Sequence, residues 1–158
     1  MKADRLTGWA GFTSAPIVAR VANSIVVAGT SAVLAIAAWL EPSPLGHSTH
    51  LQLGLGRCTF FALTGYPCPM CGATTTFALM AHGRLFAGLL NQPFASLLFA
   101  LSVAALAVAV SELVAPRQRW TRIAKAMEPY EGWLAAGFLG FMCAAWIYKI
   151  ALVRSLFG

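Results

Sequence analysis

Three cysteines, Cys58, Cys68 and Cys71, are the residues of this sequence whose type and spacing could do chemistry. The last two form a Cys-x-x-Cys pair followed directly by Gly72. Prolines on both sides of Cys68 hold the residues before them in extended backbone, and glycine adopts backbone angles that other residues avoid. We therefore predict a stiff turn that presents both sulfur atoms of the pair on one side.

A thiolate pair at this spacing is half of a metal site. Zinc, for example, takes four ligands and binds cysteine sulfur at about 2.3 Å. Cys58 would add a third sulfur, and His50 or His47 would add a fourth ligand. We predict Cys58, Cys68, Cys71 and His50 as ligands of zinc or another thiolate-bound metal.

The same cysteines have two other interpretations. In an oxidising compartment, two of them would form a disulfide that only braces the turn and leaves one thiol over. A cysteine at a helix N-terminus has a stabilised thiolate, so the pair could also be a redox dithiol, with Thr74–Thr76 capping that helix. The sequence shows no strand–helix alternation of the thioredoxin type and no known catalytic motif, so we expect no enzyme and assign no catalytic residue.

The chain around the cysteines is strongly apolar. It is 59% hydrophobic and 10% charged, whereas soluble domains carry charge on about a quarter of their positions. Uncharged runs predict three transmembrane helices, at about residues 18–40, 93–113 and 132–153. Lys149, near the end of the third, is expected to extend its ammonium group outward to the membrane surface. The fold class is thus all-α integral membrane, with residues 1–158 forming a single membrane domain.

The cysteine motif lies between the first and second predicted spans. Residues 58–83 are uncharged and could form a fourth span, which would invert the orientation of everything after it. Two prolines and two glycines among residues 65–72 argue against a continuous helix, because the freed backbone groups need other partners in lipid. We predict a re-entrant or interfacial segment within residues 46–91, with short helices over Thr59–Leu63 and Thr74–Ala81.

Basic residues indicate how the chain sits in the membrane. The loop between the second and third spans holds Arg117, Arg119, Arg122 and Lys125, whereas the loop before it holds only Arg57 and Arg84. Because positive loops stay in the cytoplasm, the N-terminus is predicted to be cytoplasmic and the cysteine loop to face outward. The segment 115–131 is predicted to be either a surface helix, with Trp120, Ile123 and Met127 facing lipid, or a basic connecting loop.

The predicted partners follow from the same features. The net charge of +6 is explained by anionic lipid headgroups and topology. The basic residues flank apolar runs and form no stripe with interleaved aromatics, so no nucleic-acid partner is expected. Small residues four apart in the second and third spans either let helices pack closely, within the chain, with another copy or with a membrane-protein partner, or reflect only the abundance of alanine.

The motif also resembles a known family. Cys58, the apolar stretch ending in Thr64-Gly65, and the run Cys68-Pro69-Met70-Cys71-Gly72-Ala73-Thr74 are similar to the core of the bacterial membrane-protein family called domain of unknown function 2752. His82-Gly83-Arg84 and Asn91-Gln92-Pro93 resemble its closing elements, although Gln92 interrupts the usual Asn-Pro and Thr75 stands where many members have arginine. Gly46–Leu55 is similar to a segment in one branch of the family, which favours His50 over His47.

The resemblance covers about residues 41–95 and implies a protein of the bacterial inner membrane. It implies no activity. We therefore expect a small polytopic membrane protein with a metal- or thiol-based site at the Cys-Pro-x-Cys-Gly turn. The alternatives are a structural or partner-binding subunit whose cysteines only brace the loop, and a membrane thiol oxidoreductase.

Overall fold

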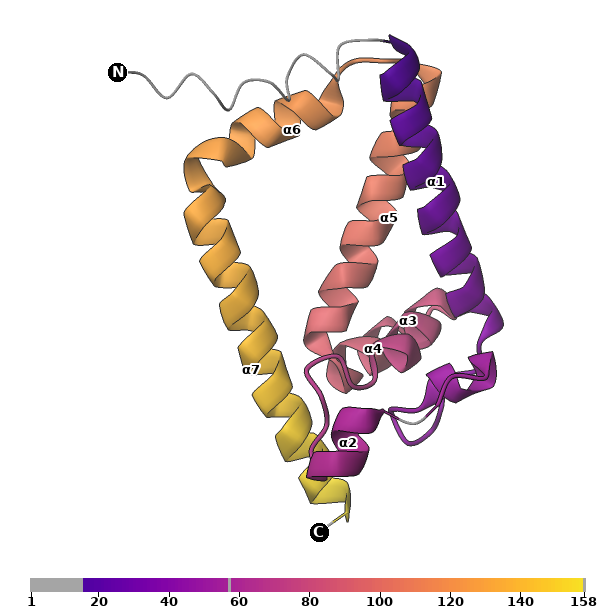
Figure 1. Ribbon diagram of the computed structural model, residues 1–158, viewed down its shortest axis with the longest axis vertical. Helices are drawn as coiled ribbons and strands as arrows, with labels where there is room; N and C mark the ends of the chain where they lie inside the picture. Colours follow the sequence, from indigo (N-terminus) through magenta and orange to yellow (C-terminus); the bar gives the residue numbers. More distant parts are fainter. Residues whose placement is uncertain (1–15, 57, 158) are drawn as a thin grey trace.

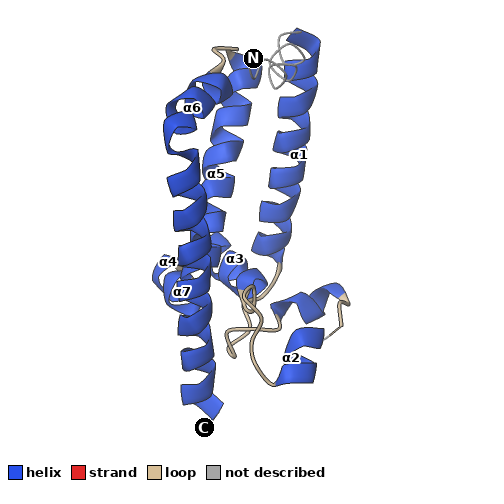
Figure 2. Cartoon of the chain, turned by 60° about the vertical axis from the view of Figure 1, so that its left-hand side comes forward, coloured by secondary structure: helices blue, strands red, loops and turns tan. Residues whose placement is uncertain are grey.

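The computed structural model describes residues 16–56 and 58–157, and within them it is built from helices without strands (Figures 1 and 2). The long helices are α1 (Pro16–Trp39), α5 (Pro93–Val114) and α7 (Glu131–Phe157). The shorter ones are η2 (Thr49–Leu53), α2 (Thr59–Thr64), α3 (Ala73–Ala81), α4 (Leu85–Asn91), α6 (Arg119–Met127) and η3 (Glu128–Tyr130). The N-terminus, which is predicted to be cytoplasmic, belongs to residues 1–15, and these lie outside the described residues. Arg57 of the first loop lies outside them too.

The three long helices fall where spans are predicted. Each is long and apolar enough to cross a membrane, and apolar side chains along them are largely exposed. In water such a surface would be a liability, whereas in lipid it is the expected one. The all-helical membrane class is therefore confirmed, and the chain is a multi-pass membrane protein. A single domain over residues 1–158 stays a prediction.

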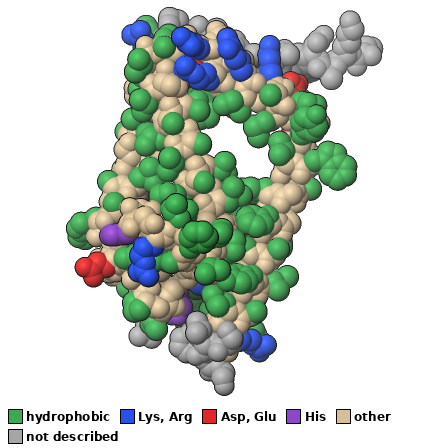
Figure 3. Space-filling view, turned by 180° about the vertical axis from the view of Figure 1, so that it is seen from behind, with side chains coloured by type: hydrophobic (Ala, Val, Ile, Leu, Met, Phe, Trp, Pro, Cys, Tyr) green, Lys and Arg blue, Asp and Glu red, His purple; other side chains and the backbone are tan. Residues whose placement is uncertain are grey.

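The long helices do not form an evenly packed bundle. Helix α1 packs along α5, and α3 contacts both of them at one end. Helix α7 meets this group through Phe94 of α5, whose ring lies 4.9 Å from that of Phe138 and 6.1 Å from that of Phe141. Toward the opposite end α7 stands apart, and Figure 3 shows an opening through the molecule between α7 and the other long helices.

The segment between α1 and α5 holds the cysteines at the end where α7 joins the group (Figure 1). Helices α2 and α3 lie where two short helices are predicted, and the sequence analysis missed α4, which follows them. Gly65 follows α2 and Gly72 precedes α3, and their positive φ angles of 71° and 85° prevent a continuous helix through the turn. No described helix within residues 58–83 is long enough to be a fourth span, and re-entry into the membrane stays a prediction.

The opposite end of the molecule carries the basic helix α6, so the segment 115–131 is not merely a connecting loop. A corner before α6 forms around the Glu112 carboxylate, which accepts backbone N–H bonds from Arg117, Gln118 and Arg119 at 3.0–3.3 Å. Trp120 ties α6 to α1 by donating its indole N–H to Asn23 Oδ1 at 2.9 Å. Lysine and arginine side chains gather on this end (Figure 3).

Candidate functional site: a cysteine pocket

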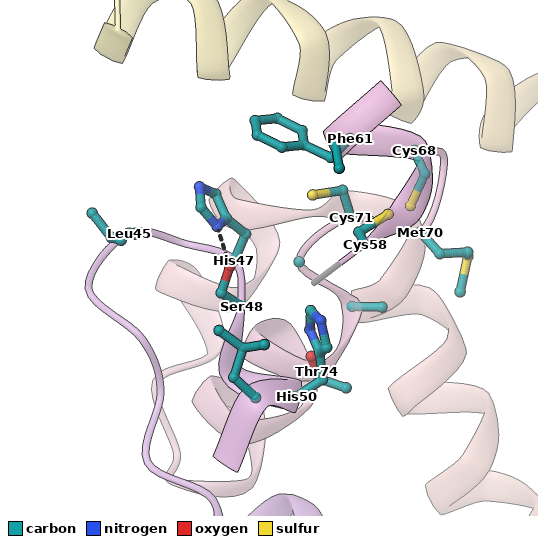
Figure 4. A pocket seen from close by; sticks show the side chains of 14 residues that line it. Leu45, His47, Ser48, His50, Cys58, Phe61, Cys68, Met70, Cys71 and Thr74 are labelled. Atoms are coloured by element: carbon teal, nitrogen blue, oxygen red, sulfur yellow. Dashed lines mark hydrogen bonds between the residues drawn. The ribbon is translucent and has the colours of Figure 1, made fainter. Parts of the chain in front are cut away.

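One pocket contains all four residues that were predicted to form a site. It has a volume of about 940 Å³ and lies between the loop after α1, helix α2 and the start of α3 (Figure 4). Its lining includes Cys58, Cys68, Cys71 and His50, together with His47 and Met70. The structure therefore brings these four residues to one location, and their role as a site stays a prediction.

The cysteine turn, residues 66–72, is held in place from several sides. Within it, Cys71 N–H donates to Cys68 O at 2.9 Å, which closes the turn across the Cys-x-x-Cys spacing. From α7, the indole N–H of Trp146 donates to Pro67 O at 2.7 Å. From the start of α5, the side chain of Gln92 donates to Pro69 O at 2.8 Å. Because both outer contacts reach the backbone, they fix the turn beside Cys68 without using its thiol.

The three cysteines of the pocket are free thiols, and they are arranged differently from a simple Cys-x-x-Cys pair. The thiols of Cys58 and Cys68 lie close enough that each shifts the pKa of the other, and a thiolate at either position raises the pKa of Cys71. Figure 4 shows the three side chains together at one side of the pocket. Cys68 therefore has two neighbouring thiols: Cys58, which precedes α2, and Cys71, which lies in the same turn.

The local environments separate the pKa values of these thiols. Cys58 precedes α2, and the backbone N–H of Phe61 lowers the pKa of its thiol. Burial raises the pKa of Cys68, and burial also raises the pKa of Cys71, to about 11. Since the thiolate is the reactive form, Cys58 is the thiol most ready to react at neutral pH.

Metal binding at this pocket is chemically reasonable, because thiolate and imidazole are ligands that zinc and copper prefer. In the part of the chain that the structure describes, however, no three His, Cys, Asp or Glu side chains are grouped closely enough to hold an ion. Binding would require these side chains to move together. The metal assignment of Cys58, Cys68, Cys71 and His50 stays a prediction.

His47 lines the pocket as well as His50, although the sequence analysis ranked it lower. Its Nδ1 lies 2.7 Å from Ser48 Oγ, and its ring centroid lies 5.9 Å from that of Phe61. Burial lowers the pKa of His47, and the positive charge of Lys149 lowers it further. His47 is therefore held as a neutral imidazole at the edge of the pocket, fixed by its neighbours.

Lys149 was predicted to extend outward, and this prediction is wrong. Its side chain is only 1% exposed, although it lies near the end of α7. The ammonium group donates to Gly46 O at 3.1 Å, to Asn91 O at 3.2 Å and to Asn91 Oδ1 at 2.8 Å. Three oxygen acceptors replace the water that the ammonium would otherwise have reached, which explains why it turns inward.

Asn91 connects this buried charge to the cysteine turn. Its side-chain amide donates to Gly72 O at 3.3 Å and to Thr76 Oγ1 at 2.9 Å. The sequence analysis named Asn91 only as part of a closing element of the family, and in the structure it is the last residue of α4. An ionisable residue inside an apolar span was the signal that could have identified this network, because such residues face polar partners.

A comparison with known proteins bears on this region of the chain. No curated protein and no solved structure matches it. Residues 58–106 match a family model, and this stretch begins at Cys58, contains the whole cysteine turn and ends within α5. The matching family is the one described as "Protein of unknown function (DUF2752)", the same family that the cysteine motif resembles.

Proposed function

We propose that this chain is a protein of the bacterial cytoplasmic membrane with an outward-facing thiol site, at which Cys58 and Cys68 exchange disulfides with a partner. The observation that carries the proposal is that these two free thiols lie near each other in one open pocket. A Cys58 thiol with a lowered pKa beside a second thiol is the arrangement that thiol–disulfide exchange needs.

The reaction conserves atoms and electrons. The Cys58 thiolate attacks one sulfur of a partner's disulfide, and the other partner sulfur leaves as a thiolate. Cys68 then attacks the Cys58 sulfur of this mixed disulfide, which releases the second partner thiolate and forms the Cys58–Cys68 disulfide. The pair loses two electrons, the partner's disulfide gains them, and the thiol proton of Cys68 is taken up by the released thiolates. The reverse sequence oxidises a partner dithiol.

The charge at the two ends of the molecule supports the orientation. Among the described residues, the α6 end holds Arg20, Arg117, Arg119, Arg122 and Lys125, and the cysteine end holds Arg84, Lys149 and Arg154. Because the more positive side of a membrane protein stays in the cytoplasm, the cysteine pocket faces outward. An outward pocket meets oxidising conditions, in which disulfides form and persist.

A thiol count tests the reaction. In a Cys143→Ser background, which removes the exposed cysteine of α7, we expect glutathione disulfide to lower the number of free thiols from about three to about one per chain, since one disulfide consumes two. Adding Cys68→Ser should instead trap Cys58 as a mixed disulfide with glutathione, seen as an added glutathione mass, because the thiol that resolves it is missing. A count that glutathione disulfide does not change would contradict the proposal. A disulfide that forms once and resists further exchange would identify a structural brace.

A second candidate function is metal binding, and the presence of two histidines and Met70 in the same pocket as the three thiols favours it. Elemental analysis of protein purified under reducing conditions should then give about one metal ion per chain, absent from the Cys68→Ser variant. Metal content that is the same with and without Cys68 would rule out a site at these thiols.

Single-cysteine variants test the orientation. With Cys58 as the sole cysteine, a membrane-impermeant maleimide applied to intact spheroplasts should label the protein. With a sole cysteine introduced by Thr121→Cys on α6, labelling should require lysis, because that end is predicted to be cytoplasmic. The opposite pattern would show that the pocket faces the cytoplasm.

A further inference from the structure

We propose that Cys71 is a third reacting thiol. It attacks the Cys58–Cys68 disulfide, so that the disulfide ends between Cys68 and Cys71 and Cys58 is released. This inference rests on the proposed thiol function and adds a second, internal step to it. Its starting point is the position of Cys68, which shares the pocket with Cys58 and is joined to Cys71 by the backbone bond of the turn.

The contacts around the turn bring Cys71 to the same sulfur. The bond from Cys71 N–H to Cys68 O folds the two residues against each other across two intervening positions. Both thiols line the pocket, and the charge of a thiolate at either Cys68 or Cys58 acts on Cys71. The Cys-x-x-Cys spacing is the one that disulfide oxidoreductases use for their redox pair.

The exchange has a defined chemical direction. The Cys71 thiolate attacks the Cys68 sulfur of the Cys58–Cys68 disulfide, the bond between Cys68 and Cys58 breaks, and Cys58 leaves as a thiolate. No electrons are gained or lost overall, and the proton lost by Cys71 balances the thiolate that Cys58 becomes. A thiol of low pKa is the better leaving group and one of high pKa the stronger nucleophile, so the environments of Cys58 and Cys71 favour this direction of attack.

The buried ammonium group of Lys149 supplies a positive charge close to Cys71, which this step needs. A thiol as buried as Cys71 is poorly ionised, and Lys149 is the nearby positive charge that favours its thiolate. A side chain placed at Gly72 would have its Cβ 3.1 Å from Lys149 Nζ, which shows how closely the ammonium approaches the residue after Cys71. Lys149 is therefore a positioning residue for the second step, and it does not contact the Cys58–Cys68 pair.

The functional result is that the thiol that attacks first is released. Once the disulfide has moved to Cys68 and Cys71, the Cys58 thiolate is free again. Cys58 can then attack a second partner disulfide and hold that partner as a mixed disulfide, which Cys68 resolves once the Cys68–Cys71 disulfide has been reduced. A two-cysteine site could not bind the second partner covalently before being reduced.

The test follows the disulfides in time. Full-length Cys143→Ser protein in nanodiscs is mixed with glutathione disulfide, quenched with acid at intervals, alkylated and mapped by mass spectrometry. We expect the Cys58–Cys68 disulfide first and then its replacement by Cys68–Cys71, with Cys58 becoming alkylatable again. Cys71→Ser should stop the reaction at the first disulfide. In Cys58→Ser, the Cys68–Cys71 disulfide should form at least about ten-fold more slowly.

Other outcomes separate the two proposals. If Cys58–Cys68 forms and Cys68–Cys71 never follows, the relay is overturned and the proposed function stands. If Cys68–Cys71 forms equally fast in Cys58→Ser, the two residues pair directly and the relay is likewise overturned. If no disulfide forms at all, the proposed function itself is wrong.

A charge variant tests the role of Lys149. Lys149→Met keeps most of the side-chain length and removes the charge, so we expect the second step to slow at least about five-fold while the first keeps its rate. Asn23→Ala removes the bond between α1 and α6 at the opposite end of the molecule and serves as a control for general destabilisation. Slowing of both steps by Lys149→Met, or equal slowing of the second by Asn23→Ala, would contradict this role.

Discussion

The two ends of the molecule are built on different principles. At the cysteine end, hydrogen bonds join residues far apart in sequence, such as Lys149 to Gly46 and Trp146 to Pro67. At the α6 end, the corner around Glu112 is local and involves residues 117–119. The one long-range hydrogen bond that the structure shows at that end joins Trp120 to Asn23. The cysteine end thus depends on the whole chain, and the other end mainly on its own segment.

This contrast indicates where precise geometry is needed. Fixing side chains from distant segments costs conformational entropy, which is recovered only if the contacts are well made. The α6 end needs little beyond positive charge to set orientation, and charge requires no exact placement. The cysteine end instead holds reactive groups at fixed relative positions. Substitutions should therefore be more harmful at the cysteine end than matched substitutions elsewhere.

The largest effect is expected at Gly72. A Cβ there would lie 2.5 Å from Gly46 O, and the residue has a φ of +85° that only glycine adopts easily. We expect Gly72→Ala to destabilise the protein by about 3 kcal/mol, through steric overlap and backbone strain together. Unfolding by denaturant in detergent micelles would measure the change.

Gly54 provides a matched control, because its φ is +73° but no atom lies within 4 Å of a Cβ placed there. Gly54→Ala should therefore show the backbone strain alone, about 1 kcal/mol. Equal losses for the two variants would mean that the close approach at Gly72 contributes nothing to stability.

A smaller difference is expected between two buried asparagines, Asn91 at the cysteine end and Asn23 at the α6 end, each 8% exposed. The side chain of Asn91 bonds to Gly72, Thr76 and Lys149, so Asn91→Ala leaves a buried ammonium short of an acceptor. We expect a loss of about 2 kcal/mol, against about 1 kcal/mol for Asn23→Ala. Thermal unfolding of both variants in the same detergent measures the difference, and a reversed order would refute the contrast between the ends.

The smallest expected effect is a difference in how the alkylation rates of Cys58 and Cys71 depend on pH. Cys58 has a lowered pKa, so it should be alkylated fastest of the three pocket thiols near pH 7. The pKa of Cys71 is about 11, so its rate should rise about ten-fold per pH unit between pH 7 and 10 as its thiolate fraction grows. Iodoacetamide labelling followed by mass spectrometry reads both rates. A pH profile shared by the two thiols would show that their environments do not differ.

Features governed by local sequence were predicted correctly. Uncharged runs located the long helices, and the prolines and glycines around Cys68 located the turn between α2 and α3. Proline and glycine act on their own backbone, so no knowledge of distant segments was needed. The same reasoning correctly expected residues 115–131 to contain a helix as one of two alternatives.

Features that depend on how helices meet were not predictable in this way. Sequence spacing drew attention to Cys68 and Cys71, whereas the fold also brings the thiol of Cys58 close to that of Cys68. The inward position of Lys149 depends on Gly46, 103 residues away, and on Asn91. A rule about lysines near span ends describes an isolated helix in lipid, and it fails where another segment offers oxygen acceptors.

The opening between α7 and the other long helices leaves the tilt of α7 dependent on what fills the space. A bilayer leaves no empty space, so acyl chains or a neighbouring helix must occupy this gap. Changes in bilayer thickness or lateral pressure would then act on the tilt of α7. Since α7 carries both Trp146 and Lys149, a change in its tilt is transmitted to the backbone on either side of the cysteine turn. We therefore expect the reactivity of the pocket thiols to change with the lipid composition around the protein.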